Sequence, residues 1–337
     1  MKMPNIKSFK AYYYNNDIIK KLNDVIAPPY DVINSTQQDQ LYKTSPFNIV
    51  RVILGKEEPA DNDTSNKYTR AAGYLDEWIK NGVLKQDNEP ALYLLKQDFN
   101  YDSKRYSRLG LIGLVELIDF DKKEIFPHEE TLSAPKADRL KLLEATRANY
   151  SPIFSLYFDK EKIIENIFNS LKENPPFLKA VGQNKVENAI WKITNTGQLS
   201  KIINMLKDKQ VFIADGHHRY ETALNYSKLH PELISQGAGF TLMYFSNMAQ
   251  KDFLVLPTHR LIKKSNVANI QELKEKLEEF FDIQKASNLK EVLEAVEDKD
   301  SLYKFGLFFK DEFFILSLRD KNQVFDSLKI NKSCEYK

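Results

Sequence analysis

The chain has 337 residues, of which 42% are hydrophobic and 28% are charged. At ~150 residues per domain this length predicts about two domains, and the composition excludes a wholly disordered chain. The 49 Lys and Arg residues nearly balance the 47 Asp and Glu residues, for a net charge of +2, so no strong overall field favours a nucleic-acid partner.

Cysteine content and hydropathy exclude further classes of protein. Cys334 is the single cysteine, which excludes an internal disulfide framework and a Cys-rich metal site. No run of the sequence approaches the ~20 apolar residues of a membrane-spanning helix, and residues 1–16 lack an apolar signal core. We therefore expect a cytoplasmic globular protein with no membrane partner.

Hydrophobic periodicity predicts a mixture of strands and helices in the first half of the chain. Pro28 and Pro29 predict a rigid turn because proline fixes φ. The expected elements that follow are a strand at 47–54, a helix at 68–79, strands at 91–99 and 106–118 and a helix at 137–148.

The second half shows the same mixture and ends in an expected hairpin. The expected strands are 153–158, 189–193, 211–214 and 240–245. The expected helices are 163–171, 273–281 and 289–296, and two more that contain residues 202–206 and 220–227. Residues 302–309 and 313–318 are expected to form a hairpin. The fold class is α+β (mixed α/β). We place an N-terminal part at 1–160 and a C-terminal part at 161–337, either as two domains or as one compact unit.

The segment Asp215-Gly216-His217-His218-Arg219 is expected to join a buried strand directly to a helix. The first N–H groups of a helix lack intrahelical partners and form a site for anions. Gly216 would let the backbone approach a phosphate, and Arg219 can grip phosphate with two parallel hydrogen bonds. Asp215 would hold Mg²⁺ or orient a histidine. The other interpretation is a capped helix start with two surface histidines.

A second polar segment, PHEET at 127–131, precedes the helix expected at 137–148. Position 132 is Leu rather than His, which excludes a two-histidine zinc motif. Glu129 is suited to act as a general base, and the alternative is an exposed loop with ordinary charges. Lys136, Arg139 and Arg147 follow, and the spacing of the two arginines puts them on one helix face, toward either an anion or solvent.

Five segments in order resemble a known family. They are APPYDV (27–32), YTRAAGYLDEWIKNGVL (68–84), FPHEETLSAPKADRLKLLEATRANYSPIF (126–154), ADGHHRYETAL (214–224) and LPTHR (256–260). Over nearly the whole chain they resemble the bacterial and archaeal family catalogued as domain of unknown function 1015. Residues 329–337 depart from the pattern expected there, which is typical of a truncated or altered C-terminus.

The motif pair is also similar to that of the free serine kinases of the ParB/sulfiredoxin superfamily, which phosphorylate L-serine with a nucleotide and Mg²⁺. This resemblance implies a ParB/sulfiredoxin-like core elaborated by inserted helices and extra strands. It implies a site for the phosphates of ATP or ADP at residues 216–219, with Glu129 as the catalytic carboxylate beside His128 and Asp215 as a site acid. Sulfiredoxins carry Cys where His217 stands, so reduction of a sulfinic acid is disfavoured.

These patterns favour a small-molecule phosphotransferase that acts on serine or phosphoserine, in either direction. Lys136, Arg139 or Arg147 would hold the carboxylate of the acceptor or spread phosphate charge. We expect Glu129 and the Gly216 turn to line one pocket with His218, Arg219 and at least one of Arg139 and Arg147. The alternatives are a ParB-like nucleotide-binding switch or interaction module without phosphotransfer, and a scaffold with no chemistry.

Overall fold

The computed structural model describes residues 5–127, 133–182, 184–256, 259–262, 269–297 and 303–320, and the side chains of 133–135 are not described. The expectations for His128 and Glu129, and for the chain end at 329–337, therefore lie outside the described residues. The chain divides into two compact units, residues 1–255 and 256–337.

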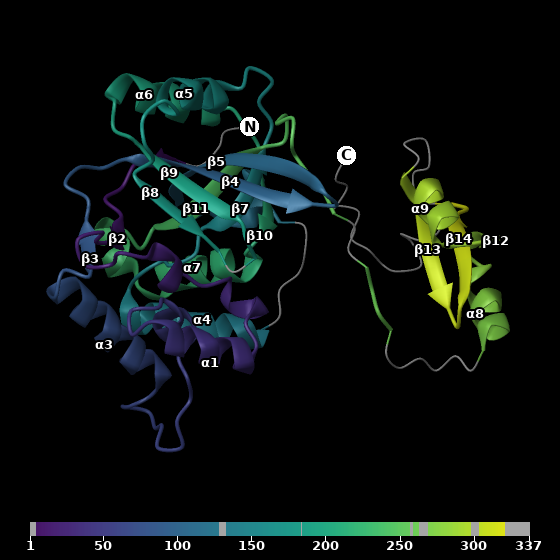
Figure 1. Ribbon diagram of the computed structural model, residues 1–337, viewed down its shortest axis with the longest axis horizontal. Coiled ribbons are helices and arrows are strands. Elements are labelled where there is room, and N and C mark those ends of the chain that lie inside the picture. Colours follow the sequence, from purple (N-terminus) through teal and green to yellow (C-terminus); the bar gives the residue numbers. More distant parts are fainter. Residues whose placement is uncertain are drawn as a thin grey trace. The chain divides into compact units, whose positions relative to one another are not determined.

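Unit 1 is built on a nine-stranded mixed sheet in the order β6-β10-β7-β11-β5-β4-β9-β8, with β1 paired to β5 (Figure 1). The strands are β1 (Ile6–Lys7), β4 (Leu92–Tyr101), β5 (Lys104–Glu116), β6 (Ile125–Phe126), β7 (Ile153–Tyr157), β8 (Leu178–Val181), β9 (Glu187–Ile193), β10 (Val211–Asp215) and β11 (Phe240–Asn247). A separate pair joins β2 (Tyr12–Tyr14) to β3 (Leu84–Gln86).

Helices cover both faces of this sheet. Figure 1 shows α5 (Ile163–Leu171) and α6 (Thr196–Leu206) on one face and α7 (His217–Leu229) on the other. Against α7 packs α4 (Ser133–Thr146), and α3 (Lys67–Lys80) packs against α4. The remaining helical segments of this unit are α1 (Ser35–Thr44), α2 (Val50–Ile53), η1 (Leu22–Asp24), η2 (Tyr30–Val32), η3 (Phe120–Lys122) and η4 (Pro231–Gln236). In the described ranges no helix combines the length and the apolar character needed to span a membrane.

Two buried clusters hold the layers together. The larger lies in the sheet and includes Ile164 of α5 and Ile202 of α6. The smaller joins Val25 of the N-terminal segment to Trp78 of α3 and Leu142 of α4. This second cluster fixes the segment that contains the Pro28-Pro29 turn against α3 and α4.

The structure confirms a mixed α+β class, but the strand expected at 47–54 is wrong. Residues 50–53 form the short helix α2, and Val50, Val52 and Ile53 are all buried. A short apolar run buried on every side cannot be distinguished from a strand by its periodicity. Buried Asn48 favours the helix because its Oδ1 accepts from the N–H of Val50 and its Nδ2 donates to the carbonyl oxygen of Asp24.

The boundary expected near residue 160 falls inside unit 1. Strand β7, which precedes this position, pairs with β10 and β11, which follow it. One sheet therefore includes both sides of residue 160, and the division of the chain lies instead at 255–256.

Unit 2 contains a three-stranded antiparallel sheet in the order β12-β14-β13. Its elements are α8 (Ile270–Leu277), β12 (Phe281–Ala286), α9 (Leu289–Glu297), β13 (Lys304–Phe309) and β14 (Glu312–Leu318). The hairpin expected at 302–318 is thus confirmed by β13 and β14. Ala286, Val292 and Ile315 form its small buried cluster.

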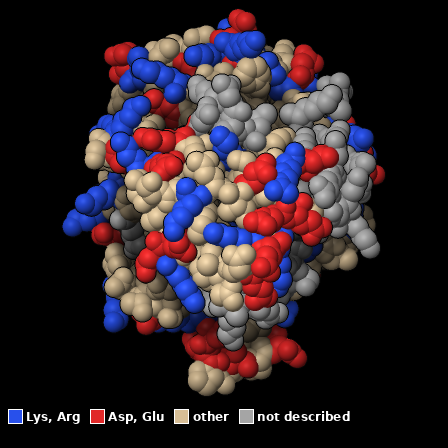
Figure 2. All heavy atoms as spheres, turned by 90° about the vertical axis from the view of Figure 1, so that its right-hand side faces the viewer, with Lys and Arg blue, Asp and Glu red and all other residues tan. Residues whose placement is uncertain are grey.

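Charges of both signs are interspersed on the face drawn in Figure 2. On the face shown in Figure 2, Lys and Arg residues alternate with Asp and Glu residues, and its described residues form no broad region of one sign. This face fits the small net charge of the chain and offers no track for a polyanion.

Candidate anion-binding site

The candidate site lies at one edge of the sheet in unit 1. Strand β10 pairs in parallel with β6, with Phe212 opposite Phe126, so the carboxyl ends of both strands meet at this edge. Strand β10 is antiparallel to β7, and β7 is parallel to β11, so the latter two strands begin at the same edge. Along the chain, residues 128–132 lie between β6 and α4. Strand β6 pairs with β10, and α4 packs on α7.

The start of α7 is organised by Gly216 and Arg219. Gly216 has φ +93°, and a Cβ added there would lie 2.8 Å from the guanidinium carbon of Arg219. Only glycine suits both conditions. The Arg219 guanidinium donates to Oδ2 of Asp215 at 2.5 Å and to the carbonyl oxygen of Pro152 at 2.6 Å. Arg219 thereby ties the end of β10 to the start of α7 and to the residue before β7.

The remaining residues of this segment differ in exposure. His217 is only 1% exposed, so a phosphate outside the fold would meet its backbone N–H rather than its ring. His218 is half-buried, and the Asp215 side chain is 61% exposed. The segment therefore presents backbone donors, one guanidinium and one carboxylate toward the solvent edge.

A second guanidinium, that of Arg139 on α4, is held on three sides. It lies over the Tyr30 ring, 4.0 Å from the ring centroid. Its Nη1 donates to the carbonyl oxygen of Ile53 at 2.8 Å, and its Nε donates to Oδ2 of Asp138 at 2.9 Å. The Arg139 side chain is 11% exposed, so its position is set by these partners rather than by solvent.

Asp138 is the residue that orients Arg139. Its Oδ1 accepts from the Tyr68 hydroxyl at 2.7 Å and lies 3.1 Å from Nζ of Lys67. Burial raises the pKa of Asp138, but Arg139, Tyr68 and Lys67 outweigh it and lower the pKa to about 2. The carboxylate is therefore ionised at neutral pH.

Tyr30 lies against Arg139 and lines the same cavity as Arg219. Burial raises the pKa of its hydroxyl, and the positive charges of Arg139 and Arg219 offset part of that rise. The Tyr30 hydroxyl is therefore protonated at neutral pH and available as a donor.

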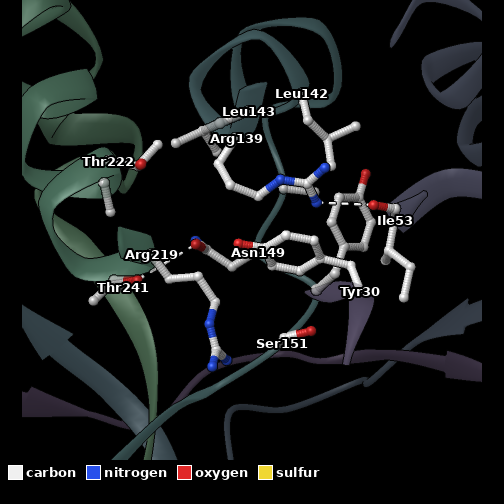
Figure 3. Close-up of a pocket in the computed structure, with 13 residues that line it drawn as sticks. Tyr30, Ile53, Arg139, Leu142, Leu143, Asn149, Ser151, Arg219, Thr222 and Thr241 are labelled. Carbon is white, nitrogen blue, oxygen red and sulfur yellow. Dashed lines mark hydrogen bonds between the residues drawn. The ribbon is translucent and has the colours of Figure 1, made fainter. Parts of the chain in front are cut away.

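Arg139 and Arg219 line one small cavity of about 60 Å³, and none of the described residues in its wall is acidic. In Figure 3 the Arg139 guanidinium lies over Tyr30, whereas the Arg219 side chain extends away from Arg139. Thr222 is 4% exposed, and its hydroxyl has no hydrogen-bond partner among the described residues. The other polar lining residues are Asn149, Ser151 and Thr241, besides the backbone and ring of Tyr150. Cationic and donor groups without a carboxylate are suited to an anion.

The other residues singled out in the sequence do not line this cavity. Nζ of Lys136 pairs with Oε2 of Glu221 on α7 at 2.8 Å, and Arg147 lines a second cavity next to the first. Asp215, Gly216 and His218 adjoin Arg219 in the chain but are not among the lining residues.

Sequence reasoning missed Tyr30, Asp138 and Thr222 as site residues. The Pro28-Pro29 turn was a usable signal for Tyr30, because a rigid turn holds the next side chain in a fixed direction. Thr222 lies one helical turn beyond Arg219 on α7, so a residue on that face of the expected helix was also a candidate.

The described residues contain no group of three or more His, Cys, Asp or Glu that could hold a metal ion. Mg²⁺, however, is usually held by one or two carboxylates together with substrate phosphates and water. Asp215 is exposed, and only its Oδ2 accepts from Arg219. Asp215 therefore fits the role of the one protein ligand of a Mg²⁺ ion whose other ligands would be nucleotide phosphates and water.

Comparison with known proteins gave one family match. A family model with the description "Protein of unknown function (DUF1015)" matches residues 6–332. Neither the comparison with curated proteins nor that with solved structures gave a significant match.

Proposed function

The chain belongs to this family of unknown function, and from its site we propose a nucleotide- and Mg²⁺-dependent phosphotransferase that acts on serine or phosphoserine. One observation carries the proposal. Arg139 and Arg219, from separate helices, line one cavity whose described lining residues include no acid, beside the sheet edge where β10 leads into the DGHHR segment. Phosphoryl transfer needs such positioning and charge stabilisation more than covalent chemistry.

The nucleotide is assigned to the start of α7. The backbone N–H groups of His217 and His218 lie in the first turn of α7, at the positive end of the helix dipole, where they would cradle phosphate oxygens. Arg219 lies over Gly216 in the same place and retains donors beyond those that bond Asp215 and Pro152. When bound, Mg²⁺ neutralises charge on the transferred phosphoryl group, with Asp215 as its protein ligand.

The acceptor is assigned to the cavity between α4 and α7. Arg139, held by Asp138 and Tyr30, would bind the anionic part of the acceptor or of the phosphoryl group. The pair of Lys136 with Glu221 joins the two helices that form the cavity walls, so Lys136 supports the geometry instead of contacting the substrate.

The chemical step conserves atoms and charge as follows. The oxygen of the acceptor hydroxyl attacks the terminal phosphorus of ATP, the bond from that phosphorus to the bridging oxygen breaks, and ADP leaves. Glu129 accepts the hydroxyl proton as general base, with His128 beside it. In the reverse direction phosphoserine gives its phosphoryl group to ADP, and Glu129 returns the proton to the serine oxygen.

Phosphorus NMR tests this function directly. The protein with ATP, Mg²⁺ and L-serine is expected to form phosphoserine and ADP, and with ADP and phosphoserine to form ATP. Glu129→Gln and Asp215→Asn are each expected to lower the rate by roughly 10²-fold or more. Lys141→Met, which removes an exposed cation of α4 outside the cavity, is the matched control. Nucleotide binding without transfer in either direction would support a nucleotide-binding module instead.

A further inference from the structure

A second cavity of about 250 Å³ adjoins the first, and the two share Leu143, Asn149 and Ala223 in their walls. Asn149 faces both cavities, and its Oδ1 lies 3.4 Å from the Thr241 hydroxyl of the first. We refer to this second cavity as the Arg147 chamber. The Arg147 chamber therefore lies next to the proposed acceptor cavity.

Apolar side chains dominate the lining of the Arg147 chamber. Those lining residues are Leu114, Leu143, Ala223, Tyr226, Leu233, Ala238 and Phe240. Tyr226 and Ala223 are buried on α7, so their positions are fixed by the fold. A cavity with an apolar wall and few polar groups is typical of a site that takes an apolar body and orients it by a polar anchor.

Arg147 is the polar anchor of this chamber. Its side chain has no hydrogen-bond or ion-pair partner in the described part of the chain, in contrast to Arg139 and Arg219. The described lining residues include no Asp or Glu, and Nζ of Lys7 lies 4.0 Å from the ring centroid of Phe240. The charges at this chamber are therefore positive and complement an anion.

Arg147 has a left-handed backbone at the end of α4. Arg147 follows the last residue of α4, its N–H donates to the carbonyl oxygen of Leu143 at 2.7 Å, and its φ is +52°. Helices commonly end on such a left-handed residue, but that residue is usually glycine because a side chain there is disfavoured. Lys123 and Lys162 share this φ, so the backbone sets where α4 ends, and the assignment of Arg147 rests on the cavity that it lines.

We propose that the Arg147 chamber binds the carboxylate and the apolar side group of the preferred acceptor, a serine-like hydroxy carboxylic acid with an apolar body larger than that of serine itself. Serine, which lacks this body, is then the weaker acceptor. Arg147 pairs with the carboxylate, the apolar wall covers the side group, and the hydroxyl extends past Asn149 into the first cavity. The statement that this compound accepts phosphate rests on the proposed function, whereas its binding does not.

Calorimetric titration of the full chain without nucleotide tests the binding. Serine, threonine and phenylserine carry the same carboxylate and hydroxyl with a growing apolar body. Phenylserine is expected to bind about 10-fold to 100-fold tighter than serine, which corresponds to burial of one phenyl group. Equal affinity for serine and phenylserine would overturn the inference.

A cycle of ligand and protein changes tests the role of Arg147. The methyl ester of phenylserine, which has no carboxylate charge, is expected to bind the wild-type protein at least about 10-fold more weakly than the acid. The Arg147→Gly variant suits the left-handed backbone and is expected to bind acid and ester equally weakly. Lys141→Met is again the control and should leave the preference for the acid intact. An ester that binds the wild-type protein as tightly as the acid would contradict the assignment.

Assays of phosphorylation with serine and with phenylserine distinguish failure of this inference from failure of the proposed function. Tight, Arg147-dependent binding of phenylserine without phosphorylation would leave the chamber assigned and remove the phosphotransferase function. Phosphorylation of serine with no preference for an apolar acid would retain that function and refute the acceptor proposed for the chamber.

Discussion

Arg139 lies in α4 and Arg147 directly follows its last residue, so the helix expected at 137–148 ends before Arg147 and the two arginines do not share one helix face. Their surroundings also differ. Arg139 is held by Asp138, the Ile53 carbonyl oxygen and the Tyr30 ring. Arg147 has none of these constraints within the described residues and extends from a left-handed backbone at a wider cavity. One guanidinium is thus positioned before any ligand binds, and the other has donors to offer a ligand.

The difference shows how one arginine can be held in place by the fold while a nearby arginine remains available to a ligand. Removal of a charge that is paired in the fold lowers the free energy of unfolding, because its partner is left buried and unpaired. An unpaired charge contributes little to the free energy of unfolding and contributes to binding only when an anion is bound. The two residues therefore differ in what their substitution changes. Loss of Arg139 is expected to lower stability and activity, and loss of Arg147 is expected to lower ligand affinity without lowering stability.

The largest effect is expected for Arg139→Met. This substitution removes the cation that Asp138 and Tyr30 both contact and leaves the Asp138 carboxylate with Tyr68 and Lys67 only. We expect a loss of about 2 kcal/mol in the free energy of unfolding, since the carboxylate is only partly buried, and at least a ~10²-fold fall in kcat/KM. Urea unfolding and steady-state kinetics measure the two. A variant with normal stability and normal rate would show that the pre-positioned arginine has no role.

Asp138→Asn is expected to have a comparable effect that depends on pH. Folding lowers the pKa of Asp138 to about 2, so its contribution to stability is complete above the pKa of the unfolded chain, ~3.9, and is lost as pH falls through the folded value. The wild-type protein should exceed the variant by about 2 kcal/mol at pH 7, and the two should converge between pH ~4 and ~2. Urea unfolding at several pH values measures this, and a difference that does not change with pH would exclude an electrostatic cause.

Gly216→Ala is expected to destabilise the protein by about 1–2 kcal/mol. The φ of +93° disfavours any side chain, and the new Cβ would displace the Arg219 guanidinium. Because Arg219 would leave its place at the start of α7, nucleotide affinity should fall as well. Gly82→Ala is the matched control, since Gly82 also has positive φ but has no neighbouring atom near a Cβ. If both variants lose nucleotide affinity equally, the Arg219 contact is not the cause.

The smallest effect on stability, and one of opposite sign, is expected for Arg147→Gly. The left-handed backbone at this position favours glycine, so the free energy of unfolding should rise by about 1 kcal/mol. Thermal unfolding monitored by circular dichroism measures the change. A destabilised variant would mean that Arg147 has structural contacts, and the contrast with Arg139 would then be lost.

Much of this fold was predictable from the sequence, and the failures have physical causes. The helix expected at 163–171 and the paired strands near 91–118 follow from strong periodicity, and the structure confirms them. The segment 47–54 was misassigned because its burial on every side leaves no periodic signal. The boundary near 160 could not be inferred because strand pairing between distant segments is not encoded in local pattern.

The site was predictable only in part. A strand that leads through Gly216 into a helix with Arg219 was expected and is present. The link from Tyr68 through Asp138 to Arg139 was not foreseen, because it joins positions 70 residues apart that meet only when α3 packs on α4. Charged residues on one helix look alike in a sequence, and only the tertiary partners separate Arg139 from Arg147.

The most direct test of the central claim is a crystal structure of the full chain with ADP, Mg²⁺ and L-serine. We expect the terminal phosphate of the nucleotide at the start of α7, against the backbone N–H groups that follow Gly216 and the guanidinium of Arg219, with the amino acid in the cavity lined by Arg139. An ordered nucleotide bound away from that helix start would contradict the account.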